Sequence, residues 1–181
     1  MFELNVPNVL TLLRILLVPV LVVALLNETE NGDLLAATVF ALASLTDFVD
    51  GWLARSSDSV TTFGKLMDPI ADKLLVIAAL VSLVSLDRLA AWVAMVIIAR
   101  ELAVTIARAQ APEVIPAATL GKLKTVAQVV AIFFVILLHP APGWVDALVY
   151  LAVAVTVVSG LTFFLDLRQR PAASSHSRID V

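Results

Sequence analysis

Six long apolar stretches follow one another along the chain, separated by short segments that are polar or contain proline and glycine. About 20 apolar residues suffice for a helix to cross about 30 Å of hydrocarbon, and backbone exposed to lipid must satisfy its own hydrogen bonds. The pattern therefore predicts an all-α integral membrane protein with six transmembrane helices. We place these helices at Val9–Leu26, Leu34–Trp52, Ile70–Leu86, Leu89–Arg108, Leu120–Leu138 and Trp144–Leu165.

Composition agrees with a lipid environment. Hydrophobic residues make up 61% of the chain and charged residues 15%, whereas soluble domains have about 45–50% and about 25%. The net charge of −3 and the absence of a basic run argue against a nucleic-acid partner. The absence of cysteine excludes disulfide scaffolds, thiol catalysis and thiolate metal sites. We therefore expect membrane lipids to be the chain's main surroundings.

Basic residues divide unequally between the two sets of loops. Cytoplasmic loops carry the excess of lysine and arginine in membrane proteins. One set here contains only Arg88, whereas the other contains Arg55, Lys65, Arg108, Lys122, Lys124, Arg168, Arg170 and Arg178. We therefore expect a multi-pass protein of the cell membrane with both termini cytoplasmic. Residues 1–170 should form one transmembrane domain, and the polar, serine-rich residues 171–181 a disordered cytoplasmic tail.

Charged residues within the expected spans gather toward the cytoplasmic side. A charge at the centre of an inserting helix costs roughly 2.5–3.5 kcal/mol, so each one needs an explanation. At 1.5 Å per residue, Asp47 lies about 20 Å and Arg100 about 17 Å from the outer ends of their helices. Arg14 and Lys73 lie near the cytoplasmic starts of theirs. This distribution predicts a polar cavity that opens to the cytosol.

Four carboxylates are spaced to share this cavity. Asp47 and Asp50 are three residues apart on one expected helix, and Asp68 and Asp72 are four apart on the next, so each pair shares a helix face. Grouped acids repel one another unless cations neutralise them, and Mg²⁺ or Mn²⁺ prefers such oxygen ligands. Two such ions would favour displacement at phosphorus. Alternatively, Asp68 before Pro69 has a structural role as a helix cap.

The same region carries a longer motif with fixed spacing. It reads Asp47-Phe-Val-Asp50-Gly51-Trp-Leu-Ala54-Arg55, then eight residues to Gly64, three to Asp68 and three to Asp72. This motif resembles the full signature of the CDP-alcohol phosphatidyltransferase family. The resemblance implies six transmembrane helices, a homodimer, and two divalent cations held by Asp47, Asp50, Asp68 and Asp72. It also implies that Asp72 is the general base.

The resemblance further implies where the CDP-linked lipid binds. Gly51, Ala54 and Arg55 would form the seat of the cytidine diphosphate group, since glycine permits close backbone approach and arginine binds phosphate oxygens in a forked geometry. The expected binding set for CDP-diacylglycerol is completed by Asn8, Thr11, Arg14, Thr61 and Gly64. For Asn8 and Arg14, simple anchoring of the first helix is the alternative.

Residues outside the signature resemble the branch that makes phosphatidylglycerophosphate. They include Ile98-Ala-Arg100-Glu101 and Gly121-Lys122-Leu-Lys124-Thr125 with Gln128. Arg100, Lys122 and Lys124 would form a cationic pocket that suits an acceptor carrying its own phosphate, such as glycerol 3-phosphate. The expected reaction is metal-dependent transfer of a phosphatidyl group from CDP-diacylglycerol to glycerol 3-phosphate, with release of CMP. Glu101 could instead orient Arg100, and the two lysines could merely extend to the membrane surface.

Three alternative functions remain open at this point. Two are enzymes of the same family with other acceptors, namely a cardiolipin synthase and a phosphatidylinositol phosphate synthase. The third is a divalent-cation transporter that uses the four aspartates as its ion site. The concentration of charge at one depth disfavours transport, because carriers place polar groups at the midplane and beyond.

Overall fold

The computed structural model describes residues 6–53, 62–110 and 119–169. These residues are all helical apart from short turns, and they contain no strand. The six helices are α1 (Val6–Leu26), α2 (Glu30–Leu53), α3 (Thr62–Ser85), α4 (Ala91–Gln110), α5 (Thr119–Leu137) and α6 (Gly143–Gln169). The expected all-α class is confirmed, and each observed helix overlaps one expected apolar span.

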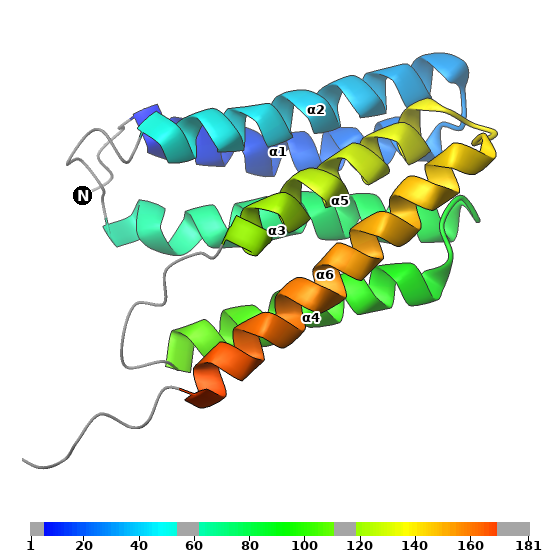
Figure 1. Ribbon diagram of the computed structural model, residues 1–181. Coiled ribbons are helices and arrows are strands. Elements are labelled where there is room, and N and C mark those ends of the chain that lie inside the picture. Colours follow the sequence, from blue (N-terminus) through cyan, green and yellow to red (C-terminus); the bar gives the residue numbers. More distant parts are fainter. Residues whose placement is uncertain (1–5, 54–61, 111–118, 170–181) are drawn as a thin grey trace, which may run out of the picture.

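The helices run alternately up and down a single bundle (Figure 1). Helix α1 packs against α2 and α3, α5 packs against α2 and α6, and α4 packs against α6. The centre of the bundle is apolar, with fully buried side chains that include Leu21, Leu25, Phe40, Leu80 and Ile136. This order brings α4 beside α6, although the whole of α5 lies between them in the sequence.

Two tight turns fix the end of the bundle where α2 begins and α3 stops. Thr29 caps α2, because its Oγ1 accepts a hydrogen bond from the backbone N–H of Gly32 at 3.0 Å. At the end of α3, the N–H of Arg88 donates to the carbonyl of Leu83 at 2.9 Å, and the N–H of Asp87 to that of Val84 at 3.1 Å. These two bonds, with a φ of 56° at Asp87, form a Schellman motif.

An ion pair joins these two turns. Arg88 Nη1 lies 2.6 Å from Asp33 Oδ1, and the arginine side chain is 3% exposed. A buried charge is costly unless it is paired, and Asp33 in the first turn of α2 supplies the partner. Arg88 therefore has a packing role in addition to the topological one expected from its position.

Many large apolar side chains lie on the outside of the bundle. Examples are Leu16 and Val23 on α1, Met95 on α4 and Leu161 on α6, each at least 60% exposed. Among the described residues, α6 is long and apolar enough over Gly143–Arg168 to cross a membrane, and Leu12–Leu26 and Lys73–Ser85 form shorter apolar helices. Membrane crossing by the other five helices and a cytosolic cavity stay predictions.

Candidate functional site

The sequence-predicted site residues that the structure describes lie toward one end of the bundle. The starts of α1, α3 and α5 and the ends of α2, α4 and α6 meet at that end, on the left of Figure 1. Asn8, Thr11 and Arg14 belong to α1, and Gly51 belongs to the last turn of α2. Up-and-down connectivity therefore gathers positions that are more than a hundred residues apart in the sequence.

The four aspartates occupy two helix ends within this region. Asp47 and Asp50 lie in the last two turns of α2, and Asp68 and Asp72 lie in the second and third turns of α3, with Gly64 before them. Both helices pack against α1. The backbone thus supports one half of the expectation, a shared helix face for each pair. Their side chains, together with all of Ala54, Arg55 and Thr61, lie outside the described residues.

Helix α3 begins earlier than its apolar stretch. Apolarity alone placed the expected start at Ile70, but the helix extends back through Lys65 to Thr62. Asp68 is therefore an interior helical residue, and the alternative interpretation of Asp68 as a helix cap is wrong. The start was misplaced because a helix can include polar residues before its apolar stretch, and hydropathy alone does not detect them. With capping excluded, the structural explanation offered for Asp68 no longer applies.

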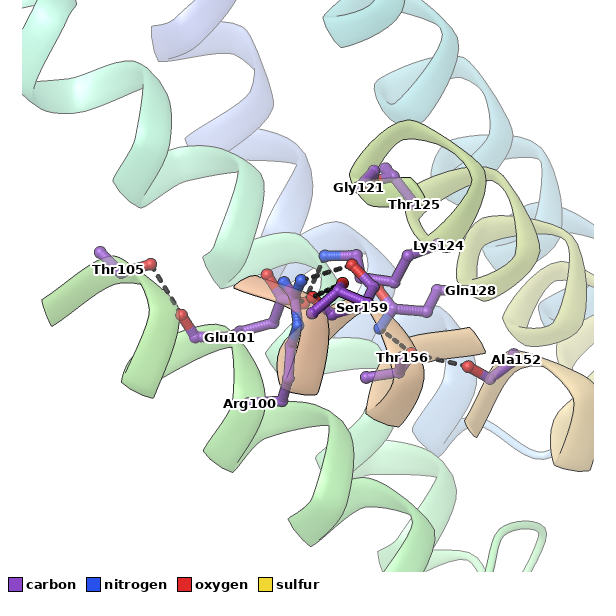
Figure 2. A network of polar contacts seen from close by, with 11 residues as sticks. Arg100, Glu101, Thr105, Gly121, Lys124, Thr125, Gln128, Ala152, Thr156 and Ser159 are labelled. Carbon is purple, nitrogen blue, oxygen red and sulfur yellow. Dashed lines mark hydrogen bonds and ion pairs between the residues drawn. The ribbon is translucent and has the colours of Figure 1, made fainter. Parts of the chain in front are cut away.

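A network of polar side chains connects α4, α5 and α6 (Figure 2). Glu101 Oε1 forms ion pairs with Lys124 Nζ on α5 and, at 3.4 Å, with Arg100 Nη1. Their side chains are only 7% to 15% exposed. Two cations thus share the carboxylate of Glu101. Such a cluster suits an anion with several oxygens, because arginine and lysine both donate charge-assisted hydrogen bonds to such groups.

Helix α6 supplies further contacts to this cluster. Arg100 Nη2 donates a hydrogen bond to Ser159 Oγ at 2.7 Å. One turn away, Gln128 Nε2 donates to Thr156 Oγ1 at 2.8 Å, and this hydroxyl donates to the carbonyl of Ala152 at 2.6 Å. Ser159 and Thr156 are buried and three residues apart, on the same face of α6. Sequence reasoning missed both residues, since they appear only as small polar interruptions of an apolar run.

A small pocket between α3, α4 and α5 adjoins this network. Its polar lining residues are Lys73, Glu101, Lys124, Thr125 and Gln128, and apolar side chains complete the wall. It has space for about one water molecule. Lys73 directly follows Asp72 in α3, so the pocket reaches the helix that carries two of the four aspartates.

The basic residues of the expected acceptor pocket are not all in the same place. Arg100 and Lys124 meet through Glu101, and Lys124 is buried. Lys122 is exposed, because a separation of two residues turns a side chain by about 200° around a helix. Arg14 on α1 is only 3% exposed. The structure thus brings together two of the three predicted phosphate-binding residues.

The residues of the four-aspartate group fit hard divalent cations by their donor chemistry. Carboxylate oxygens are the ligands that Mg²⁺ and Mn²⁺ prefer, and the backbone puts all four carriers at one end of the bundle. Among the side chains that the structure describes, which exclude those of the four aspartates, no group of three or more acids and histidines could hold a metal ion.

Comparison with known proteins agrees with the family that the sequence motif resembles. The model of a family described as CDP-alcohol phosphatidyltransferase matches residues 4–158. A CDP-diacylglycerol–glycerol-3-phosphate 3-phosphatidyltransferase of Bacillus subtilis is 44% identical, over 88% of this chain and 93% of its own length. A probable phosphatidylglycerophosphate synthase of Mycobacterium tuberculosis is 42% identical, over 88% and 79%. A Rickettsia felis protein with the same name as the Bacillus relative is 35% identical, over 88% and 93%.

Proposed function

Because the chain belongs to the CDP-alcohol phosphatidyltransferase family, we propose that it transfers a phosphatidyl group from CDP-diacylglycerol to glycerol 3-phosphate. The products are phosphatidylglycerophosphate and CMP, and the process is phospholipid biosynthesis. The observation that carries this proposal is the 44% identity, over 88% of this chain, to a relative with that activity in its name. The polar network described above supplies a chemical reason for the acceptor.

The acceptor carries a phosphate, and this is the group that the network would bind. Arg100 and Lys124 are two partly buried cations that share the single carboxylate of Glu101. A phosphate offers three oxygens to them, and hydrogen bonds between charged groups are about twice as strong as neutral ones. Serine or free inositol has no phosphate, so it would form fewer charge-assisted hydrogen bonds with these two residues.

The reacting groups would meet where α2 and α3 carry their aspartates. Asp47, Asp50, Asp68 and Asp72 would hold two divalent cations, Mg²⁺ or Mn²⁺, which supply charge stabilisation at phosphate oxygens when bound. Asp72 would accept the proton of the acceptor hydroxyl as general base. The hydroxyl oxygen then forms a bond to the lipid-linked phosphorus, and the bond to the CMP oxygen breaks.

The donor would be held by residues on three segments. Gly51, Ala54 and Arg55 follow the first aspartate pair and would seat the cytidine diphosphate group. The remaining members of the proposed donor set are Asn8, Thr11, Arg14, Thr61 and Gly64. The apolar exterior of the bundle supports a location in which the acyl chains stay in the bilayer while the polar groups react at its surface.

The full topology is part of the same proposal. All six helices would cross the cell membrane, with both termini in the cytoplasm and residues 1–170 as one transmembrane domain. The apolar length of α6 and the exposed apolar side chains of the other helices support this arrangement. The homodimer follows from the family resemblance alone.

A panel of acceptors tests the proposed reaction. Purified protein would receive CDP-diacylglycerol, Mg²⁺ or Mn²⁺, and one of glycerol 3-phosphate, inositol 1-phosphate, inositol, serine or phosphatidylglycerol. We expect CMP release when glycerol 3-phosphate is the acceptor and none with the other four acceptors. Turnover with another acceptor would overturn the acceptor assignment. Metal uptake into proteoliposomes without any CMP release would instead indicate a cation transporter.

A further inference from the structure

Two adjacent residues of α6 contact the side chain of Arg100 from the far side of the network. Ser159 accepts a hydrogen bond from Arg100 Nη2 at 2.7 Å and is 4% exposed. Gly160 leaves space for the aliphatic part of the arginine. A Cβ atom at this position would lie 3.1 Å from Arg100 Cγ and 3.5 Å from its Nε. The Arg100 side chain thus contacts the hydroxyl of Ser159 and packs closely against Gly160, which has no side chain.

These contacts restrict the guanidinium group from two directions. Glu101 on the same helix as Arg100 is 3.4 Å from Nη1, and Ser159 on α6 binds Nη2 (Figure 2). The Nε atom is buried and has no hydrogen-bond partner among the described residues. A buried donor without an acceptor is uncommon and calls for a ligand or another explanation. Arg100 therefore has one fixed orientation and unused donors.

We infer that Ser159 and Gly160 are positioning residues that hold Arg100 ready for the phosphate of the acceptor. The inference rests on the proposed function and extends it, because neither residue belongs to the expected site and both lie just beyond the family match at residues 4–158. The ligand class is a phosphate monoester of a small alcohol. An arginine held in advance loses less conformational entropy on binding, and this lowers the acceptor's KM.

Steady-state kinetics on purified full-length variants tests the inference. Ser159→Ala removes the hydroxyl, and Gly160→Ala forces the arginine to move by a few tenths of an ångström. For each variant, we expect a rise of about fivefold to tenfold in the KM for glycerol 3-phosphate. The KM for CDP-diacylglycerol should stay within about twofold of the wild-type value. The matched control is Ser82→Ala, which removes a similarly buried serine hydroxyl from α3 and should change neither constant.

A double variant separates positioning from general packing. In the Arg100→Ala background, Ser159→Ala should add no further rise in acceptor KM, because the group that it positions is gone. An unchanged acceptor KM in Ser159→Ala, or equal rises for both substrates, would overturn the inference. If Ser159→Ala does not fold, Gly160→Ala decides by the same criterion.

The single variant Arg100→Ala shows which proposal has failed. If Arg100→Ala raises the acceptor KM but Ser159→Ala and Gly160→Ala do not, the positioning role is wrong and the acceptor pocket stands. If Arg100→Ala affects both substrates equally, the acceptor pocket itself is wrong. An absence of CMP release in the wild-type protein would reject the proposed function.

Discussion

Lys124 on α5 and Glu101 on α4 form an ion pair inside the bundle, and their side chains are 7% and 15% exposed. The two residues are 23 positions apart and lie on consecutive helices that are bridged at this point through side chains. Arg100 shares the same carboxylate. The cation pair proposed to bind the acceptor is thus held in place before any substrate arrives.

Lys124→Ala should raise the KM for glycerol 3-phosphate at least tenfold, since it removes one of the two cations that we propose bind the phosphate. Lys122→Ala is the matched control, because this lysine lies two residues away and is exposed. It should change the acceptor KM by less than about twofold. The measurement is CMP release at saturating CDP-diacylglycerol. Similar effects of the two variants would contradict the assignment of Lys124.

Glu101→Gln should destabilise the protein, because it leaves two partly buried cations without their shared carboxylate. We expect the free energy of unfolding to fall by about 1–3 kcal/mol. Denaturant unfolding of the purified protein in detergent would measure the change. Glu28→Gln, in the exposed turn before α2, should stay within about 0.5 kcal/mol of the wild-type value. A Glu101→Gln variant as stable as the wild type would show that the cations do not need this partner.

Asp72→Asn should abolish turnover and leave part of the divalent-cation binding intact, because an amide cannot accept the proton of the attacking hydroxyl. CMP release measures the first effect and Mn²⁺ titration by electron paramagnetic resonance the second. Asp146→Asn, an exposed change in the first turn of α6 at the other end of the bundle, should leave both unchanged. Turnover close to the wild-type rate in Asp72→Asn would exclude this residue as the base.

Arg88→Ala should lower the free energy of unfolding by about 3–5 kcal/mol, because it leaves Asp33 without its buried partner. The double variant Arg88→Met/Asp33→Leu should recover most of this loss, since it removes both charges. Neither variant should alter the KM for either substrate, because the pair joins the start of α2 to the end of α3, and the proposed site lies at the opposite ends of these helices. A selective change in acceptor KM would show that the two ends are coupled.

The sequence predicted the helices well because each apolar run is closed by polar or proline-containing residues. The observed end of α1 at Leu26 coincides with the expected one, and α5 differs by one residue at each end. The start of α3 was missed by eight residues, since hydropathy falls at Asp68 although the helix continues. Where a helix begins or ends in a polar segment depends on its backbone hydrogen bonds, and the hydropathy of the sequence does not predict these.

The sequence predicted only those residues of the candidate site that are charged or belong to a motif with fixed spacing. Arg100 and Lys124 stand out as charges within or near apolar runs, and the structure places them in one network. Ser159 and Gly160 carry no charge and lie in an ordinary apolar helix. Their contact with Arg100 depends on how α6 packs against α4, and this lateral arrangement follows from side-chain shapes across the whole bundle.

The most direct test of the central claim is the stoichiometry of the lipid product. Purified protein in detergent micelles would receive CDP-diacylglycerol, Mg²⁺ and isotopically labelled glycerol 3-phosphate, and mass spectrometry would quantify the lipids and CMP together. We predict one labelled phosphatidylglycerophosphate for each CMP released, and no product when the divalent cation is chelated. CMP release without label in the lipid would contradict the account, because the phosphatidyl group would then have gone to another acceptor or to water.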